Sequence, residues 1–354
     1  MNNLNYPQKN ILAIDVGGTK SRAQLANLDN NIIIKLVILS ERIVGSKKEL
    51  SNFIYDLLKT HNQKIDACVI DFAGPVNNQK VRMTNWKNTP TISQNDLHNW
   101  GLPANTIILN DLEAAAYGVI DLVEKNRKFL GCIPLFKPLK IYQNNLKDGN
   151  MVLIVPGTGL GTAGIVTIKL EAGKFFKKPI ASEIQHFPVS PINKDHEELI
   201  NYLRKRKDND KDISWEDFVS GKGLKNIYEG LIATKGFRDN RDHEIGFEKD
   251  LPKWIAENAV RRNDTLCIES MDIYCKCMGR IAQLMALAYM PYAGIFIGGD
   301  VSIRNKDFIK ESNFIQELHS NQMHKDLLMK FPVYLTEQEL NINGCFWVSC
   351  HERC

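Results

Sequence analysis

The sequence predicts an α/β protein of two related domains, because two segments of the chain share one design. Each segment has an apolar run with β-branched residues, then a glycine turn, then a second apolar run, which is the pattern of two strands joined as a hairpin. The segments cover residues 11–28 and 151–170, so they begin about 140 residues apart, the length of one domain. Two unrelated glycine turns remain the alternative.

Strand-like and helix-like segments alternate between and after these hairpins, which predicts mostly parallel sheets covered by helices. The strand-like segments are residues 67–72, 106–109 and 294–297. The helix-like segments are residues 50–58, 112–123, 196–206, 215–219, 224–233 and 272–289. The longest apolar stretch, residues 281–297, is interrupted by Gln283 and Pro291, so we expect a buried helix and a buried strand there and no membrane span.

Composition excludes several classes of protein. A chain of 354 residues can build two cores, and a net charge of +4 is too small to predict nucleic-acid binding. The first ten residues lack the apolar centre of a signal peptide. The eight cysteines show neither zinc-site spacing nor a disulfide framework. We therefore expect a cytoplasmic protein in a reducing compartment, with no nucleic-acid or membrane partner.

The two glycine turns are candidate phosphate-binding loops. Glycine has no Cβ, so successive backbone N–H groups can point into one concavity and hold an anion. Thr19 and Thr158 add hydroxyl donors. Two such loops in paired domains could hold a polyphosphate together, whereas each loop alone is equally well read as a tight hairpin turn.

Other nucleotide-binding motifs do not fit the sequence. The P-loop pattern, Gly-x4-Gly-Lys-Ser/Thr, does not occur. Gly159, Gly161 and Gly164 match Gly-x-Gly-x-x-Gly, but a dinucleotide-binding fold requires a helix to follow. Residues 165–168 are instead Ile-Val-Thr-Ile, a strand pattern, so we discount this match.

Asp15 directly precedes the first glycine turn and is a candidate magnesium partner. A carboxylate beside phosphates would repel them unless a cation lay between, and Mg²⁺ bound directly or through its waters supplies that cation. The second loop has Pro156 at the comparable position. The alternative is a turn aspartate that caps its own backbone.

Asn110 and Asp111 follow a short strand and precede a helix. They therefore lie at the carboxyl edge of a predicted sheet, where α/β folds bind ligands. Asp111 could act there as the general base that takes a proton from a substrate hydroxyl. Both residue types are also preferred helix N-caps, so a purely structural role stays open.

Glu183 and His186 form a Glu-x-x-His pattern. A zinc site would need further ligands nearby, and the sequence offers none. The pair could exchange hydrogen bonds with sugar hydroxyls or simply be a surface pair. No serine nucleophile elbow is present.

Taken in order, these segments resemble the bacterial-type glucokinase family of the hexokinase–actin-like superfamily, from residue 11 to about residue 349. The motifs that carry the resemblance are Asp15-Val16-Gly17-Gly18-Thr19, Ala73-Gly74-Pro75, Met83-Thr84-Asn85, Asn110-Asp111, Gly157-Thr158-Gly159-Leu160-Gly161, Glu183 with His186, Glu216 before Val219-Ser220-Gly221-Lys222-Gly223-Leu224, and Gly298-Gly299. Each motif is modest alone, but their shared order is specific.

The resemblance implies a role for each matched residue. The expected catalytic base is Asp111. The expected hexose-binding residues are Asn85, Asn110, Asp111, Glu183, His186 and Glu216. The expected nucleotide-binding residues are Asp15, Val16, Gly17, Gly18, Thr19, Gly157, Thr158, Gly159, Gly298 and Gly299, with Asp15 also expected at Mg²⁺.

Three departures from the family pattern stand out, together with one difference from a related family. Both family glycines around Glu183 and before His186 are absent, since the segment reads Ser-Glu-Ile-Gln-His. Asp300 replaces a glycine or apolar residue and could disturb packing on the adenine side. Trp86 directly follows Asn85, earlier than in the family. No Cys-rich zinc loop follows His186, which separates the chain from the related repressor/kinase family.

The implied architecture is the two-domain actin-like ATPase (ribonuclease H-like) fold, with a small and a large α/β domain around a cleft. The small domain would comprise residues 11–111 and about 334–354, and the large domain residues 112–333. The implied activity is ATP- and Mg²⁺-dependent phosphorylation of glucose to glucose 6-phosphate, the entry step of glycolysis. A kinase for mannose, fructose or an amino sugar, and a catalytically weak sugar-binding sensor, remain alternatives. The oligomeric state stays open, with a homodimer as one option.

Overall fold

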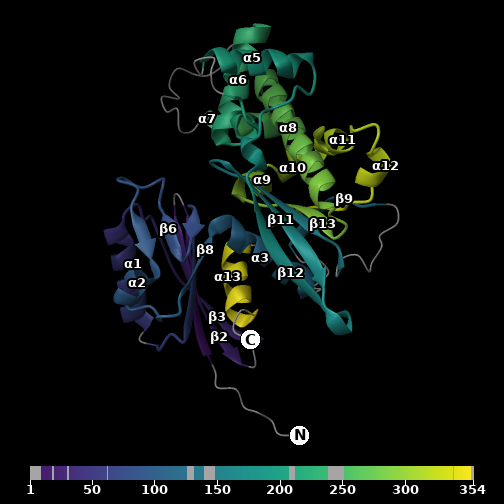
Figure 1. Ribbon diagram of the computed structural model, residues 1–354. Coiled ribbons are helices and arrows are strands. Elements are labelled where there is room, and N and C mark those ends of the chain that lie inside the picture. Colours follow the sequence, from purple (N-terminus) through teal and green to yellow (C-terminus); the bar gives the residue numbers. More distant parts are fainter. Residues whose placement is uncertain are drawn as a thin grey trace. The chain divides into compact units, whose positions relative to one another are not determined.

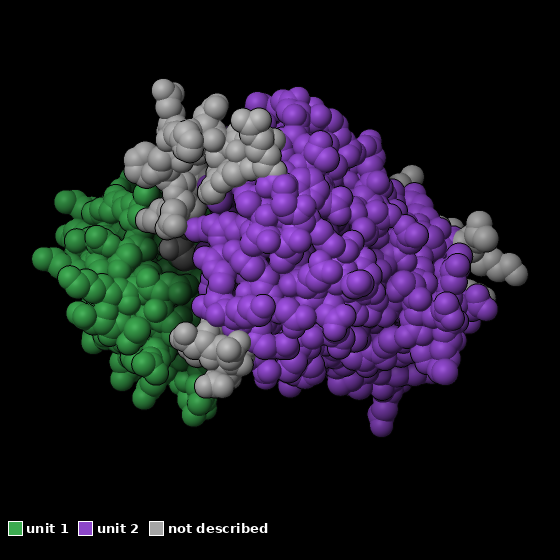
Figure 2. Space-filling view, turned by 90° about the horizontal axis from the view of Figure 1, so that it is seen from above, with its two compact units in different colours: residues 1–128, 339–354 green, residues 129–338 purple. Residues whose placement is uncertain are grey.

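The computed structural model describes residues 9–17, 20–29, 32–61, 63–125, 131–138, 148–206, 212–237, 251–337 and 339–351. The chain divides into two compact units (Figure 2): residues 1–128 with 339–354 form unit 1, and residues 129–338 form unit 2. These limits differ from the expected boundaries at residues 111 and 334. Helix α3 (Asp111–Glu124) lies in unit 1 because helix α13 (Leu340–His351), from the end of the chain, packs against it.

Unit 1 is built on a five-stranded sheet of order β3-β2-β1-β4-β8 (Figure 1). Its strands are β1 Lys9–Val16, β2 Ser21–Asp29, β3 Ile32–Arg42, β4 Ala67–Phe72 and β8 Ile107–Asn110. Strands β3, β2 and β1 pair antiparallel, whereas β1, β4 and β8 are parallel. The expectation of mostly parallel sheets is therefore wrong. A tight glycine turn can join only antiparallel neighbours, so the predicted hairpin makes half of the sheet antiparallel.

The two faces of this sheet differ in chemistry. Alternate strand residues, such as Leu12, Ile14 and Ile70, pack with Phe53 of α1 (Lys47–His61) in an apolar core. The opposite face carries buried polar residues and lies against α13. Because side chains alternate along a strand, Asp15 on β1 and its register partner Asp71 on β4 point to the face opposite the apolar core. Unit 1 also has α2 (Gln94–Asn99) and a small sheet of β5 (Val76–Asn77), β6 (Lys80–Arg82) and β7 (Thr91–Ser93).

Helices α3 and α13 lie side by side and approach very closely (Figure 1). Glycines make this possible: a Cβ on Gly118 of α3 would lie 2.1 Å from the Leu340 carbonyl oxygen, and a Cβ on Gly344 of α13 would lie 1.8 Å from that of Ala114. Backbone can meet backbone only where no side chain stands between. Trp347 stacks on Tyr117 across the same interface, with ring centroids 5.0 Å apart.

Unit 2 is built on a six-stranded sheet of order β12-β11-β10-β13-β14-β9. Its strands are β9 Cys132–Phe136, β10 Met151–Pro156, β11 Leu160–Lys169, β12 Phe175–Ser182, β13 Gly294–Ile297 and β14 Val333–Thr336. Here too a hairpin pairs antiparallel and continues into parallel strands, β10 with β13 and β13 with β14. The two predicted hairpins therefore occupy the same place in two sheets of similar topology.

Helices cover the unit 2 sheet around an apolar core. They are α5 Lys194–Arg206, α6 Gly221–Lys235, α7 Leu251–Val260, α8 Thr265–Tyr289, α9 Asp300–Arg304, α10 Lys306–Glu311, α11 Phe314–Leu318 and α12 Lys325–Leu328, with the short 3₁₀ helices η1 Glu171–Gly173, η2 Ile184–His186 and η3 Trp215–Asp217. Helix α8 ends two residues before Pro291, as the sequence predicts. No helix in the described ranges is long and apolar enough to cross a membrane.

The contact between α3 and α13 gives a direct test of how unit 1 is held together. We expect Gly344→Ala to lower the free energy of unfolding by about 1–3 kcal/mol, because the added methyl must push two helix backbones apart. Thermal and urea unfolding would measure this. Gly45→Ala is the control: its Cβ would lie 3.7 Å from a Glu49 carboxylate oxygen, an ordinary contact, so stability should change little. Equal losses in both variants would contradict the close-packing account.

Candidate active site

Three carboxylates share the polar face of the unit 1 sheet. Asp15 on β1 is paired in register with Asp71 on β4, and Asp71 is paired with Leu109 on β8. Asp111 follows Leu109 by two residues, at the start of α3. Asp15 is 5% exposed and Asp71 is fully buried. Buried like charges repel one another in a medium of low polarity, so this face must contain compensating groups.

Arg22 compensates Asp15. Its Nη2 and Nε donate to Asp15 Oδ2 at 2.8 and 3.3 Å, and its Nη1 donates to Glu339 Oε1 at 3.0 Å. Burial raises the pKa of Asp15 despite the Arg22 charge, which acts in the opposite direction. The described hydrogen bonds to the Asp15 carboxylate thus come from Arg22. Arg22 was missed, although a hairpin register counted outward from the glycine turn places it opposite Asp15.

Asn110 and Asp111 divide the two roles that the sequence left open. Asn110 is the N-cap of α3: its Oδ1 accepts from Leu112 N at 3.0 Å and Glu113 N at 3.3 Å, while its Nδ2 donates to Gly74 O at 3.0 Å. Asp111 is not the cap, although its Oδ1 accepts from Leu112 N at 2.9 Å. Burial, with the charge of Asp15 adding to it, raises the pKa of Asp111 to about 6. A carboxylate poised near neutral pH suits a general base.

The remaining candidates of unit 1 are the first glycine turn and Asn85. Val16 ends β1 and is fully buried, and Gly17 N donates to Lys20 O at 3.1 Å, closing the first turn. Gly18 and Thr19 lie outside the described residues. Asn85 is exposed, whereas the adjacent Trp86 belongs to the apolar core of unit 1. The buried side chain of Trp86 therefore holds the neighbouring, exposed Asn85 at the surface of unit 1.

The second glycine loop is tied to two neighbouring segments of unit 2. Gly157 N donates to Gly159 O at 2.8 Å, and Gly157 O accepts from Gly221 N at 2.9 Å, at the start of α6. Leu160 N donates to Glu216 Oε2 at 2.9 Å. A Cβ on Gly159 would lie 2.6 Å from that same oxygen. Glycine at position 159 therefore makes room for a carboxylate of this protein, a reason that the sequence did not reveal.

Glu183 and His186 are accessible, and a glutamine orients the first of them. The Glu183 and His186 side chains are 75% and 56% exposed, with Oε2 and Nε2 3.5 Å apart. Buried Gln185 donates from Nε2 to Glu183 Oε2 at 2.6 Å, and its Oε1 accepts from the Thr162 hydroxyl at 2.8 Å. This segment lacks the two family glycines, and Gln185 instead links it to β11.

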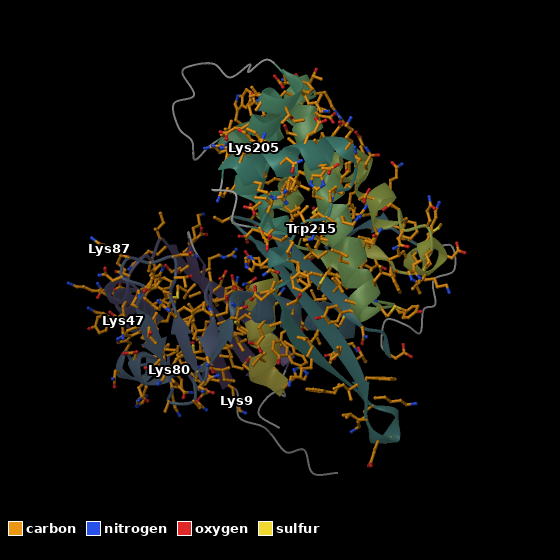
Figure 3. The ribbon with its side chains drawn as sticks, turned by 45° about the horizontal axis from the view of Figure 1, so that its top comes forward. Lys9, Lys47, Lys80, Lys87, Lys205 and Trp215 are labelled. Carbon is orange, nitrogen blue, oxygen red and sulfur yellow. The ribbon has the colours of Figure 1, made fainter. Side chains whose placement is uncertain are left out.

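The candidate hexose-binding residues of unit 2 come together. Helix η2, which carries His186, contacts η3, which carries half-buried Glu216. Next to Glu216, Trp215 is buried in the interior of unit 2 (Figure 3) and stacks on His196 at 6.3 Å between ring centroids. Burial lowers the pKa of His196 to about 4, so this histidine is a neutral packing residue at pH 7. The buried Trp215 side chain thereby holds in place η3, the 3₁₀ helix that carries Glu216.

A cavity of about 790 Å³ opens beside the second glycine loop. Thr158 and Gly157 lie at its wall, and Tyr274 of α8 also lines it, with a buried hydroxyl that has no hydrogen-bond partner in the described chain. Its cationic lining residues are Lys222, Lys225, Lys253, Arg261 and Arg304, against the single carboxylate Glu257. A cavity with apolar and cationic walls suits a ligand that combines a flat apolar part with phosphates. None of these cations was predicted as a site residue, since they lie on three separate segments of the chain, at α6, α7 and α9.

Gly298 and Gly299 connect β13 to α9 next to this loop. Gly298 N donates to Ile154 O at 2.9 Å, and Gly299 has a φ of 86°. A Cβ on Gly299 would lie 2.8 Å from the Pro156 carbonyl oxygen. Both this close approach and the positive φ therefore favour glycine at position 299. Asp300 is exposed at the start of α9 and does not line the cavity. The effect of Asp300 on packing at the adenine side stays a prediction.

No group of three or more His, Cys, Asp and Glu side chains is arranged to hold a metal ion within the part of the chain that is described. Asp15 nevertheless offers hard carboxylate oxygens beside the first glycine turn, and the Arg22 bonds involve Oδ2 alone. These donors fit a magnesium ion that keeps most of its water and binds chiefly to phosphates.

Comparison with known proteins shows which family the chain resembles. A family model described as Glucokinase matches residues 12–347. The chain is 26% identical over 324 residues to the glucokinase of Photorhabdus laumondii, with 92% of this chain and 91% of the relative covered. It is 28% identical over 331 residues to the glucokinase of Zymomonas mobilis, with 92% of each covered.

Solved structures share the fold. The glucokinase of Balamuthia mandrillaris in complex with glucose matches with a TM-score of 0.80 and 22% identity, over 96% of this chain and 93% of that one. A ROK family glucokinase of Streptomyces griseus in complex with glucose and AMPPNP matches with a TM-score of 0.57 and 21% identity, over 96% and 97% of the two chains. The predicted two-domain actin-like ATPase fold is thereby confirmed.

The raised pKa of Asp111 predicts a stability effect that needs no substrate. In the folded chain Asp111 releases its proton at a pH of about 6 instead of its ordinary value, so ionisation destabilises the native state increasingly as the pH rises through that range. Asp111→Asn should therefore stabilise the protein at pH 8, by up to about 3 kcal/mol, and have little effect at pH 4. Unfolding curves at the two pH values would measure this.

Asp96 supplies a control of opposite sign. Burial alone would raise the pKa of Asp96, but hydrogen bonds from Lys47 and Ser93 outweigh burial and lower it. Asp96→Asn should therefore destabilise the protein at pH 8, where the wild-type carboxylate is charged and bound. A stability change for Asp111→Asn that is the same at pH 4 and pH 8 would rule out a buried charge as its cause.

Proposed function

Because the chain belongs to the glucokinase family, we propose that it transfers the γ-phosphate of ATP to the 6-hydroxyl of glucose. The observation that carries the proposal is Asp111, a partly buried carboxylate with a raised pKa at the carboxyl end of the parallel strands β4 and β8. Relatives named glucokinase, and a structural neighbour in complex with glucose and AMPPNP, support the choice of substrates.

Asp111 is the proposed general base. Asn110 caps α3, so the carboxylate of Asp111 is left to accept the proton of the attacking hydroxyl. A base whose pKa is about 6 is ionised at pH 7 yet close enough to neutrality to hold a proton as the oxygen–phosphorus bond forms. An intact base also argues against the alternative of a catalytically inactive sugar sensor.

Glu183, His186 and Glu216 are the proposed hexose ligands of unit 2, with Asn85 and Asn110 contributing from unit 1. Accessible carboxylate and imidazole groups can accept from and donate to vicinal hydroxyls. Gln185 and the Leu160 N–H hold Glu183 and Glu216 in fixed orientations. Preset ligands lose little freedom on binding, which favours discrimination among hexoses.

The cavity beside the second glycine loop is the proposed nucleotide site. Gly157, Thr158 and Gly159 would present backbone and hydroxyl donors to phosphates, and the cationic lining would offset their charge. Tyr274, with its unpartnered hydroxyl, would meet the base or ribose. Gly298 and Gly299 would act through the close packing of their turn on this loop.

Asp15 would hold Mg²⁺ through the ion's waters, and the ion would neutralise charge on the transferred phosphate. Arg22 then keeps the Asp15 carboxylate at one orientation. We place the reaction in the cytoplasm as the entry step of glycolysis. A reducing compartment suits the chain because the Cys345 thiol must keep its hydrogen to donate to Asp71.

A coupled assay with ATP and a panel of glucose, mannose, fructose and glucosamine tests the proposal. Glucose should have the highest kcat/KM, and its kcat/KM should fall as the pH drops below about 6, where Asp111 gains a proton. Asp111→Asn should lower kcat by about 10²–10⁴-fold and leave glucose binding measurable by calorimetry. If the wild-type protein forms no hexose phosphate with ATP, the proposed function is wrong.

The two loop glycines should have separable effects. In Gly159→Ala the new methyl would lie 2.6 Å from Glu216 Oε2, so Glu216 must turn away and lose its bond to Leu160 N. We expect the KM for glucose to rise about tenfold. In Gly157→Ala the nearest atom is 3.9 Å from the methyl, so only the KM for ATP should change. Equal glucose KM values in the two variants would place Glu216 outside the hexose site.

A further inference from the structure

One amide group of α13 joins two of the three carboxylate residues on the polar face. Asn341 Nδ2 donates to Asp71 Oδ1 at 3.2 Å and to the main-chain oxygen of Asp111 at 3.1 Å. An amide nitrogen carries two hydrogens, so both bonds can form at the same time. Asn341 is the second residue of α13, more than two hundred residues along the chain from both partners.

Asp71 is the anchor of this arrangement. It is fully buried on β4, and its second oxygen, Oδ2, accepts from the Cys345 thiol at 3.3 Å. Both donors come from α13, one helical turn apart, so they lie on one face of that helix. The sheet register places Asp71 between Asp15 on β1 and Leu109 on β8. A buried carboxyl group with two donors from one helix fixes that helix relative to the sheet.

The contact with Asp111 is to its backbone and not to its carboxyl group. Asp111 is the first residue of α3, directly after the cap Asn110, where the chain leaves the sheet and turns into the helix. Asn341 is thus a side-chain tether on the carbonyl of this residue, in addition to the cap bonds of Asn110. Backbone orientation at Asp111 determines where its carboxylate points.

We propose that Asn341, anchored by Asp71, is a positioning residue for phosphoryl transfer: it fixes the backbone at Asp111 so that the carboxylate meets the hexose hydroxyl at the reactive angle. This inference rests on the proposed function. A base displaced by about 1 Å can cost a factor of 10² in rate even when the substrate still binds. Neither Asn341 nor Asp71 touches the substrate in this scheme.

A purely structural role for Asn341 predicts a different outcome. If Asn341 only satisfied a buried carboxyl group, its loss would lower stability and the folded fraction, while each folded molecule would keep its kcat. A positioning role instead lowers kcat in folded protein and leaves the KM for both substrates nearly unchanged, because hexose and nucleotide ligands are untouched.

The experiment compares four variants with the wild type by kcat, by KM for glucose and ATP, and by thermal unfolding. All assays are run below the temperature at which the least stable variant begins to unfold. Asn341→Ala and Asp71→Leu should lower kcat about 10–100-fold with each KM within about threefold of wild type. Asp71→Asn keeps an acceptor for Asn341 and should lose less than Asp71→Leu. If Asn341→Ala does not fold, Asn341→Ser, whose hydroxyl is too short to join both acceptors, replaces it.

Trp347→Phe is the matched control. Trp347 lies on α13 and its Nε1 donates at 2.9 Å to Glu124, which ends α3 at the opposite end of that helix from Asp111. It should lose stability and keep its kcat. The proposal is overturned if Asn341→Ala keeps the wild-type kcat, or if Trp347→Phe loses as much. A wild-type protein without kinase activity would overturn the proposed function itself, and this inference with it.

Discussion

The burial of Asp71 and Asp15 on one face of a sheet is the constraint on which unit 1 depends. An isolated buried charge is strongly unfavourable, so such a face persists only if donors reach it. Arg22 serves Asp15 from the neighbouring strand, but the donors for Asp71 come from α13, at the far end of the chain. The two described donors to Asp71 thus come from outside residues 1–128. The glycines at the crossing of α3 and α13 bring these two helices into direct backbone contact on the same side of the unit.

The parts of the fold that the sequence predicts well are those with local causes. The two hairpins and strands β4 and β13 follow from apolar runs and glycine turns within a few residues, and α8 ends where Pro291 requires it. Strands β3, β9, β12 and β14 and the small sheet of unit 1 were not predicted. Strands β9 and β14 pair with neighbours distant in sequence, whereas β3, β12 and the small sheet pair with strands nearby in the chain. Residues 215–219 form only a 3₁₀ turn, η3, because Trp215 is drawn into the core and a short, irregular segment presents Glu216.

In the candidate site, too, the residues with a local sequence signal could be predicted and those with distant partners could not. Asp111 and the glycine loops could be found from their position after strands, and family resemblance added Glu183, His186 and Glu216 as predictions. Asp71 escaped because an aspartate inside an apolar run is read as part of a strand, and its partners lie 270 and 274 residues away. Gln185 escaped for a related reason: it replaces a glycine, and only the structure shows its amide linking Thr162 to Glu183. Long-range partners leave no mark on local sequence pattern.

The two glycines of the second loop have different surroundings, so glycine stands at the two positions for different reasons. A Cβ on Gly157 would make only an ordinary contact, 3.9 Å from the Gly159 carbonyl oxygen, so the surrounding chain does not require glycine there, whereas Gly159 makes room for the Glu216 carboxylate. The second loop thus links the proposed phosphate-binding backbone to a proposed hexose ligand through one hydrogen bond, Leu160 N to Glu216 Oε2. The comparable link in unit 1 is Asn341, between Asp71 and the backbone of Asp111. In each unit, one polar group from another segment holds a proposed site residue: the main-chain N–H of Leu160 holds Glu216, and the side chain of Asn341 holds the backbone of Asp111. The precision of the proposed site therefore depends on packing beyond the residues that would contact the substrate.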